Sequence, residues 1–535
     1  MADKDLKLIQ EQADGSFAEV DLTPVAGEVL DFDASKEPQM AGAIHSGSGN
    51  TSNSGNYCSI SGQYNSSNTG GYCLISGSYN YSNSGYLCLI SGYYNYNNSG
   101  DYCLISGYYN YNNSGDYCSI SGANNTSNSG SYCSISGSSN YGNSGSYCSI
   151  SGSYNHNNSA SHCIIGGKDN DYIHADADYS LICGELNSKT GADASEGSHC
   201  IIGGKNNYNN SGDYCLISGG GHYGNHSNSG NGCSISGYYN NGNSGNYCNI
   251  SGYFNHSNSG DYCSISGFAN NSNAGDYCSI SGQGNDGNSG SSCLISGGGY
   301  FGNHSNSGNC CSISGYYNDS NSGNDCNISG CGNNSNTGDS CLISGYSNYS
   351  NSGDHCNISG RYNYSNSGGY CNISGYYNRS NSGSYCSISG KYASGNALDY
   401  ARVHGGSNNA RIIDLVAQID ATGGDNDELL LGGSGGSRII IPDQSAWMFD
   451  VHFVAKTATG ANAKMAHRTG VIVRDGTSTS ISTVNTVGTD QEIGTTNATF
   501  GCAADDTNEA LQVWCNCSSG TVRAVARIQL TQVDY

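Results

Sequence analysis

The chain has 535 residues, of which 80 are Gly, 43 are Tyr, 27 are Cys and only 3 are Pro. Charged residues make up 11% of the chain and the net charge is −24, so we expect no nucleic acid and no anionic membrane surface as a partner. No run of about 18 apolar residues is present, and we therefore expect no membrane insertion. The first residues lack the apolar stretch of a secretory signal, so we expect folding in a reducing cytoplasm, where cysteines need not form disulfides.

Residues 1–48 are acidic and do not repeat. Their apolar residues are too sparse for an independent core. We expect short strands that become ordered on a partner or on a neighbouring chain.

A 15-residue repeat fills residues 49–395, and one Cys marks almost every copy. The copy that starts at Gly100 reads Gly-Asp-Tyr-Cys-Leu-Ile-Ser-Gly-Tyr-Tyr-Asn-Tyr-Asn-Asn-Ser. A fixed short period indicates units that stack on one another, and one Cys per coil gives about 22 coils. At a rise of about 4.8 Å per coil, the predicted rod is on the order of 100 Å long.

Within each copy, Cys and Ile alternate with Ser, as at Cys118 and Ile120. A period of 2 predicts a strand whose Cys and Ile point inward. We expect the segment 128–130, Asn-Ser-Gly, to form a turn in which Asn and Gly supply positive φ. The predicted core ladder includes Cys58, Cys73, Cys88, Cys103, Cys118, Cys133, Cys148, Ile60, Ile75 and Ile120. We expect these cysteines to be packed and mostly reduced, with disulfides between coils as the alternative.

Two inserts of the same kind, Gly219–His226 and Gly297–His304, lengthen the repeat. They are predicted to project from the rod as loops, and projecting loops on a rigid scaffold often carry ligand contacts. Neutral drift after duplication is the alternative. The candidate ligand-contact residues are His222, Tyr223, Tyr300 and Phe301.

The spacing also changes around Cys183, which lies 20 residues after Cys163 and 17 residues before Cys200. The charged segment Asp169–Gly197 lies between these cysteines and contains four closely spaced acids, Asp169, Asp171, Asp176 and Asp178. Paired carboxylates could serve glycoside hydrolysis, but a solvated loop is the simpler interpretation.

No other pattern predicts catalysis, a cofactor or a metal. His162 precedes Cys163, but adjacent strand residues face opposite sides, so they cannot form a nucleophile pair. Cys515 and Cys517 share a strand face, yet a metal site would need further ligands that the sequence does not indicate. We therefore predict no catalytic residue, no cofactor and no metal site.

The C-terminal quarter loses the repeat. Residues 396–437 are interpreted as a connector that contains one strand at 411–419. Residues 438–535 contain apolar strand patterns at 438–441, 447–454, 471–473 and 522–530, separated by polar turns. This pattern predicts an antiparallel β-sandwich or jelly-roll tip, with loops at Lys456–Arg468 and Gly488–Thr499.

The repeat resembles the head repeats of YadA-like trimeric adhesins and of bacteriophage fibres, and Gly260–Gly267 matches their pattern almost position by position. Cys stands here where that family usually has Ser. The resemblance covers residues 49–395 and implies a left-handed parallel β-roll that packs as a homotrimer.

Residues 411–535 resemble the tip domain of phage tail fibres through three features: Asp427–Gly432, the Pro after Arg438–Ile441, and the strand that begins at Trp447. Together the two resemblances imply a non-enzymatic virion fibre, assembled in the host cytoplasm and acting outside the cell. In that reading residues 1–48 attach to a virion protein, and the tip binds a host receptor or glycan.

Three other functions remain open from the sequence. A bacterial surface adhesin or glycan-binding solenoid would use the repeated Tyr and Asn rows, such as those through Tyr93-Tyr94, Tyr108-Tyr109 and Tyr376-Tyr377. An ice-binding solenoid would need a regular Thr row, which the repeat lacks. A tailspike depolymerase would need a carboxylate cluster, for which Asp169–Asp193 is the candidate.

Overall fold

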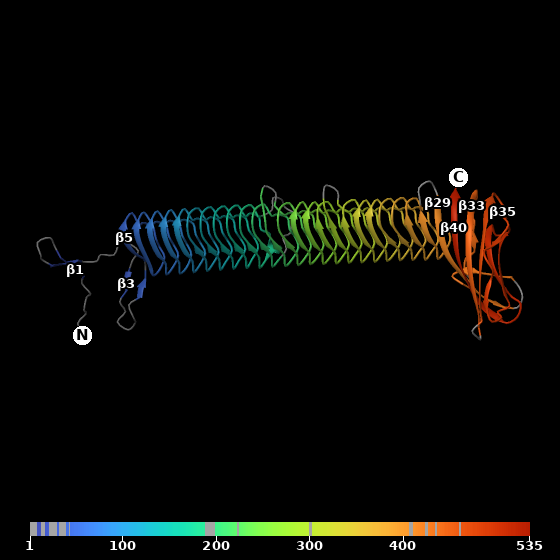
Figure 1. Ribbon diagram of the computed structural model, residues 1–535. Coiled ribbons are helices and arrows are strands. Elements are labelled where there is room, and N and C mark those ends of the chain that lie inside the picture. Colours follow the sequence, from blue (N-terminus) through green and yellow to red (C-terminus); the bar gives the residue numbers. More distant parts are fainter. Residues whose placement is uncertain are drawn as a thin grey trace. The chain divides into compact units, whose positions relative to one another are not determined.

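The structure is a computed structural model that describes residues 8–11, 17–20, 29–31, 39–41, 43–187, 198–221, 224–298, 302–405, 410–422, 426–433, 436–458 and 462–534. The chain divides into two compact units, Met1–Asn240 and Asn241–Tyr535. Figure 1 draws the strands of both units, coloured along the sequence. Within the described ranges the only helical segment is the 3-10 turn η1 (Ala175–Ala177), so the predicted all-β class is confirmed. No helix in these ranges is long and apolar enough to cross a membrane.

The first unit starts with two short antiparallel pairs and continues as a stack of parallel strands. The antiparallel pairs are β1 (Leu8–Glu11) with β2 (Phe17–Val20), and β3 (Val29–Asp31) with β4 (Gln39–Ala41). The parallel strands are β5 (Ala43–Ser48), β6 (Cys58–Gln63), β7 (Leu74–Ser78), β8 (Leu89–Tyr93), β9 (Leu104–Tyr108), β10 (Ser119–Ile120), β11 (Ser134–Ile135), β12 (Ser149–Ile150), β13 (Ile164–Ile165), β14 (Leu181–Ile182), β15 (Ile201–Ile202), β16 (Leu216–Ile217) and β17 (Ser234–Ile235). Each pairs with the next in register, so Ile75, Ile90 and Ile105 lie side by side.

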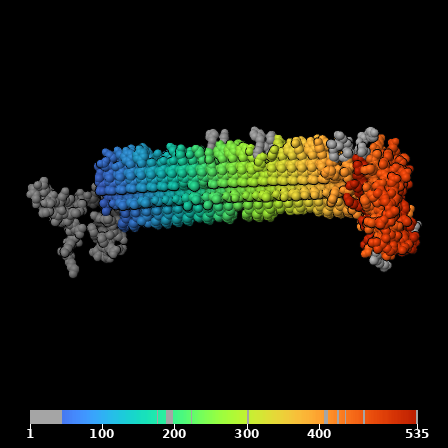
Figure 2. Space-filling model, in the orientation of Figure 1, coloured from blue at the N-terminus to red at the C-terminus, as the bar shows by residue number. Residues whose placement is uncertain are grey.

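The second unit contains a further stack of parallel strands. They are β18 (Asn249–Tyr253), β19 (Ser264–Phe268), β20 (Ser279–Gly282), β21 (Leu294–Gly297), β22 (Ser312–Gly315), β23 (Asn327–Cys331), β24 (Leu342–Tyr346), β25 (Asn357–Ile358), β26 (Asn372–Ile373), β27 (Ser387–Gly390) and β28 (Arg402–Gly405). The chain holds about 23 coils in all, close to the 22 expected, and the prediction of a parallel β-solenoid is confirmed. In the space-filling view, equivalent side chains form straight rows along each stack (Figure 2). The left hand of the coils stays a prediction.

The coil interior follows from the alternation in the sequence. Cys118 and Ile120 are 3% and 2% exposed, whereas Ser119 between them is not buried. Two residues after the end of β10, Gly122 has a φ of +101°. A Cβ there would lie 2.0 Å from the carbonyl oxygen of Gly137 in the next coil, so only glycine fits.

The turn chemistry differs from the prediction. Around the segment 128–130, positive φ occurs at Asn124, Ser127 and Tyr132, and not at Asn128 or Gly130. Asn128 is instead buried, with 1% exposure. The prediction was wrong because it counted Asn as a turn former and overlooked its amide as a partner for buried backbone groups.

The rest of the second unit is antiparallel. Its strands are β29 (Ala410–Thr422), β30 (Asn426–Glu428), β31 (Leu430–Leu431), β32 (Ile439–Ile440), β33 (Ser445–Thr457), β34 (Ala463–Asp475), β35 (Ser478–Ile481), β36 (Asn485–Thr486), β37 (Gln491–Ile493), β38 (Ala498–Asp505), β39 (Ala510–Cys517) and β40 (Thr521–Asp534). One sheet runs in the order β29–β40–β33–β34, and β35, β36 and β37 pair with the outer side of β34. In a second sheet, β30, β32 and β38 all pair with β39. The sandwich or jelly-roll arrangement of these sheets stays a prediction.

The stack and the antiparallel region meet at positions other than the expected boundaries. The coils begin before residue 49, because β5 already pairs in parallel with β6, and they continue past residue 395 to β28. The expected connector, 396–437, contains β29, which joins β28 on one side and β40 on the other. This segment is therefore an integral part of a sheet, and its apolar strand pattern at 411–419 was the signal for it.

Both predicted tip loops contain strands. The segment Lys456–Arg468 includes the end of β33 and the start of β34, and Gly488–Thr499 includes β37 and the start of β38. Their polar composition concealed the strands, because one face of an antiparallel sheet can be open to solvent.

Candidate functional site

The sulfur of each ladder cysteine links its coil to the next. Cys118 donates its thiol proton to the carbonyl oxygen of Gly130 at 3.1 Å and accepts the N–H of Cys133 at 3.4 Å. All 27 cysteines are free thiols, and every ladder cysteine named from the sequence is buried. Each thiol therefore donates one hydrogen bond and accepts another between adjacent coils, and a serine hydroxyl could do the same.

One coil has such a serine. Ser180 is 3% exposed and its Oγ accepts the N–H of Cys200 at 3.0 Å, which is the ladder position. Cys183 is exposed. The expectation that Cys183 marks its coil was therefore wrong, and the register is set by Leu181 and Ile182, which pair with Ile201 and Ile202. Spacing alone could not show that a different residue had taken the ladder position.

Two buried asparagine rows complete most coils, with Ile173 and Ala393 as replacements in two of them, and these rows were not predicted from the sequence. Asn95 is 0% exposed; its Oδ1 accepts the N–H of Asn110 at 3.0 Å, and its Nδ2 donates to the carbonyl oxygens of Ser91 at 2.7 Å and Gly107 at 3.2 Å. In the second row, Asn113 donates both its N–H and its Nδ2 to the Oδ1 of Asn98, at 3.1 and 2.9 Å. The recurrence of Asn at two fixed positions of the repeat was the signal for these rows.

The acidic segment after Cys163 holds its carboxylates with separate partners. Asp171 Oδ2 lies 2.9 Å from His156 Nε2, and burial raises the pKa of this carboxyl. Asp178 accepts the backbone N–H of Ser161 at 2.5 Å, and Asp169 lies 3.4 Å from Lys168. The contacts of Asp171 and Asp178 link adjacent coils, whereas Lys168 and Asp169 are neighbours in the sequence. The part of the candidate hydrolase cluster from residue 188 to Asp193 lies outside the described residues.

Three other predicted features remain: the ligand-contact loops, the His162–Cys163 pair and the tip cysteines. The candidate ligand-contact residues His222, Tyr223, Tyr300 and Phe301 all lie outside the described residues. His162 stacks on Tyr147 on the outside while Cys163 is buried, as predicted from strand alternation.

The tip cysteines Cys515 and Cys517 are both 0% exposed. Burial raises the pKa of the Cys515 thiol to about 12, which disfavours the thiolate that a metal would require.

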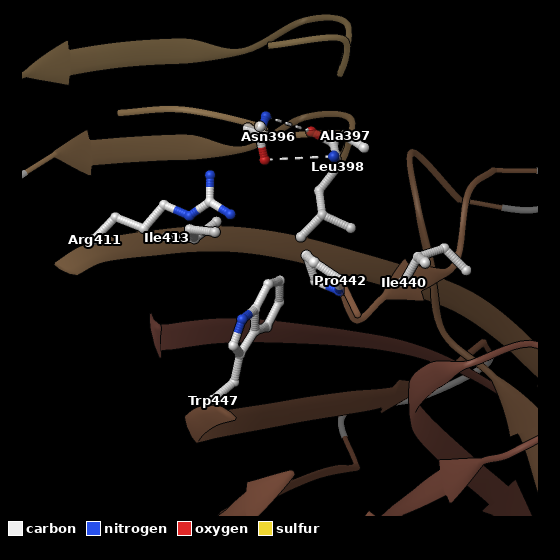
Figure 3. Close-up of a pocket in the computed structure, with 9 residues that line it drawn as sticks. Asn396, Ala397, Leu398, Arg411, Ile413, Ile440, Pro442 and Trp447 are labelled. Atoms are coloured by element: carbon white, nitrogen blue, oxygen red, sulfur yellow. Dashed lines mark hydrogen bonds between the residues drawn. The ribbon is translucent and has the colours of Figure 1, made fainter. Parts of the chain in front are cut away.

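A cavity of about 170 Å³ lies in the second unit between the last coil and the antiparallel sheets (Figure 3). It is lined by Gly395, Asn396, Ala397, Leu398, Arg411, Ile413, Ile440, Pro442 and Trp447. Trp447 is 1% exposed, and its Nε1–H has no acceptor within the described part of the chain. Arg411 donates to the carbonyl oxygen of Ser394 and to Gln532. The cavity therefore lies where the last coil meets the tip, and Arg411 of β29 links the two by its hydrogen bond to Ser394.

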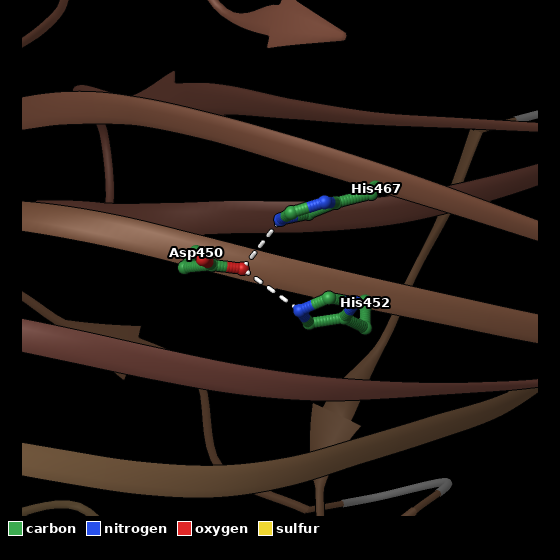
Figure 4. Close-up of side chains that lie close together, drawn as sticks. All are labelled: Asp450, His452 and His467. Atoms are coloured by element: carbon green, nitrogen blue, oxygen red, sulfur yellow. Dashed lines mark hydrogen bonds and ion pairs between the residues drawn. The ribbon is translucent and has the colours of Figure 1, made fainter. Parts of the chain in front are cut away.

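A second group of functional side chains lies on the outer face of the tip sheet (Figure 4). Asp450 and His452 are two residues apart on β33, so they share a face, and His467 lies directly opposite His452 on β34. The Oδ1 of Asp450 is 2.7 Å from His467 Nε2 and 3.1 Å from His452 Nε2. Among the described residues, this is the only group of three His, Cys, Asp or Glu ligand atoms that lie within 4.8 Å of one another.

Sequence analysis missed this cluster, although Asp450 and His452 fall on a predicted strand. The third member, His467, was assigned to a loop, and no sequence pattern indicated that β34 pairs with β33 in this register.

The comparisons with known proteins add no relative. No protein-family model matches the chain, and no curated protein matches it.

Proposed function

We propose that this protein is a structural, non-enzymatic fibre of a phage virion, in which three copies of the chain assemble and the tip binds a host receptor or glycan. In this proposal residues 1–48 attach to a virion protein, the coils form a stiff spacer, and residues 438–535 carry the receptor contact. The fibre assembles in the host cytoplasm and acts outside the cell.

The observation that carries the proposal is an outward-facing row along the coils that is apolar in two stretches. In the first stretch Leu74, Leu89 and Leu104 are paired in register and are 46%, 39% and 42% exposed. After three serines the same row is apolar again at Ile164, Leu181, Ile201 and Leu216. Contiguous exposed apolar surface of this kind is typical of protein interfaces, and neighbouring copies of the same chain would present matching rows.

The coil interior supports a structural role. Most coils are filled by one Cys, one Ile and two Asn, and the Cys and Asn side chains bond to groups of the adjacent coil. Contacts between adjacent coils give a chain in which each repeat supports its neighbours, as a spacer requires.

The oligomeric part of the proposal is tested by sedimentation equilibrium of the purified full chain. We expect a trimer, and we expect Leu89→Ser with Leu104→Ser to weaken assembly, because other coils carry Ser at this position. Tyr117→Ser is the matched control on another exposed row and should leave the mass unchanged. A monomeric wild-type chain would contradict the proposal.

The virion part is tested by electron microscopy of particles labelled with an antibody against residues 438–535. We expect label at the outer ends of fibres on particles, and we expect the purified protein to compete with particles for the host surface. Label that is absent from every particle, or found only on bacterial cells, would favour the bacterial adhesin.

A second candidate function, glycan binding by the coils, is favoured by one observation. Tyr102, Tyr117, Tyr132 and Tyr147 form an exposed row with ring centroids 4.6 to 4.8 Å apart. Exposed aromatic faces in line can stack on successive sugar rings. The test is polysaccharide binding by the wild-type chain and by the double variant Tyr117→Ser, Tyr132→Ser, which has an unchanged tip. Loss of binding in the double variant would establish this alternative.

A further inference from the structure

The tip sheet holds three possible metal ligands close together: Asp450, His452 and His467. Its three members come from adjacent strands in fixed register, so their Cα positions are set by backbone hydrogen bonds of the sheet. The two imidazole rings stack with centroids 4.0 Å apart and an angle of 18° between their planes, and both Nε2 atoms point at the same carboxylate oxygen (Figure 4).

The spacing of the donor atoms suits a first-row transition metal. Zinc bonds of about 2.0–2.1 Å in a tetrahedral site place ligand atoms about 3.3 Å apart. The Asp450 Oδ1 to Nε2 distances are 2.7 and 3.1 Å, and all three donor atoms lie within 4.8 Å of one another. Small side-chain rotations that replace the two hydrogen bonds with metal bonds would therefore be sufficient, and the backbone need not move.

The charges around the cluster also favour a cation. Within the described residues, the ion-pair partners of Asp450 are the two histidines and include no Lys or Arg. The nearest cation by strand pairing is Arg527, which stands opposite His452 on β40, and its guanidinium lies 3.7 Å from Asp414. The carboxylate of Asp450 is thus available to offset the charge of a bound ion.

We propose that Asp450, His452 and His467 bind one divalent transition-metal ion, with Zn²⁺ as the reference case, through Asp450 Oδ1 and the two Nε2 atoms. Three protein ligands leave at least one coordination position for water or for a ligand atom from outside, because His452 is 57% exposed. The ion would join β33 to β34 near the middle of the tip sheet. A single chain supplies all three ligands, so this proposal does not depend on the trimer.

The test uses the full chain stripped of metal with a chelator and titrated with Zn²⁺ by calorimetry and with Co²⁺ by absorption. Both titrations use a background with Cys183→Ser and Cys310→Ser, because these are the exposed thiols that could bind metal on their own. We expect one ion per chain, a Co²⁺ spectrum without thiolate charge-transfer bands, and a melting temperature that rises with metal.

The variants His467→Asn and Asp450→Asn should each weaken binding by about tenfold or more, since removal of even an outer-shell partner costs about 10- to 100-fold. His355→Asn is the matched control: this exposed His stacks on Tyr370 outside the cluster, and its loss should leave binding unchanged. Circular dichroism of each variant checks the fold, and Asp450→Asn preserves the side-chain shape. No stoichiometric binding by the wild-type background, or equal binding by the His467→Asn variant, would overturn the proposal.

Discussion

The buried asparagine rows give the sharpest prediction, at Asn95. Its side chain makes three hydrogen bonds: it donates to the carbonyl oxygen of Ser91 in its own coil, and in the next coil it donates to the carbonyl oxygen of Gly107 and accepts from Asn110 N–H. The variant Asn95→Ala removes all three bonds. It also leaves the buried N–H of Asn110 without its acceptor, since the methyl group of Ala cannot bond and the site is closed to water.

The magnitude follows from those contacts. The two lost bonds to carbonyl oxygens are worth about 1 kcal/mol net each, and the buried N–H of Asn110 left without its acceptor costs about 1–3 kcal/mol. We therefore expect the local free energy of opening to fall by about 3–5 kcal/mol. The effect should be confined to the coils around Asn95, because repeat proteins transmit stability mainly between nearest neighbours.

Hydrogen exchange measured by mass spectrometry reads this local free energy directly. Amides of the coil that contains Asn110 should exchange at least about a hundredfold faster in the Asn95→Ala variant, since 1.4 kcal/mol corresponds to a factor of ten. The matched control is Asn97→Ser in the same coil, where Asn97 is exposed with a φ of +52° and the equivalent residue Ser82 already occurs. Equal exchange in the two variants would refute the idea that the asparagine rows stabilise the coils.

Three further predictions concern the cysteines and one ion pair of the tip. Alkylation of the native protein at neutral pH should label Cys183 and Cys310 first, since both are exposed, and mass spectrometry of the labelled peptides checks it. Replacement of a ladder thiol, as in Cys133→Ser, should cost only about 1 kcal/mol in denaturant unfolding, because a hydroxyl can make the same two contacts. Arg468 donates to both oxygens of Asp490 at 2.8 and 2.9 Å and holds the pKa of that carboxyl below its usual range. This stabilisation is complete above the unfolded pKa of about 3.9 and is lost as the pH falls through the lower folded pKa. Asp490→Asn should therefore lower the melting temperature at pH 7, and by progressively less as the pH falls below about 3.9.

The solenoid could be predicted from the sequence because its signal is local and repeated many times. Alternation of Cys and Ile with Ser fixed both the strand and the buried face, and the structure buries Cys118 and Ile120. The fixed period then determined that equivalent residues stack. Each coil repeats the same evidence, so one irregular copy does not change the conclusion.

The buried asparagine rows could not be predicted from alternation and period alone. Asn98 is a polar residue, and its role depends on the equivalent residues of the coils on either side, which supply Asn83 as one amide partner and Asn113 as the other. Propensity arguments treat each Asn as an isolated turn former. The stacked amides are satisfied only after the coils are assembled, so composition alone gave no reason to place them inside.

The cluster of Asp450, His452 and His467 was also missed, but for a different reason. Asp450 and His452 are two residues apart, which the sequence shows, but His467 reaches them only through the pairing of β33 with β34. Strand register in an antiparallel pair depends on the turn between the strands and on the face that is buried. The polar residues 456–468 gave no clear alternation from which that register could be fixed.

The way the last coil ends links the fold to the proposed function. A parallel stack leaves an open strand edge at its end, and an open edge pairs readily with other chains. Here β28 is covered by the antiparallel strand β29, which continues into the tip sheet through its pairing with β40. The tip is therefore both the end cap of the coils and the domain to which we assign recognition. Deleting it would expose the edge of β28 and favour aggregation, so receptor binding is better tested with substitutions of exposed tip residues such as Ile493, which is 72% exposed. If Ile493→Ser abolishes competition for the host surface while the trimer persists, recognition is separated from assembly.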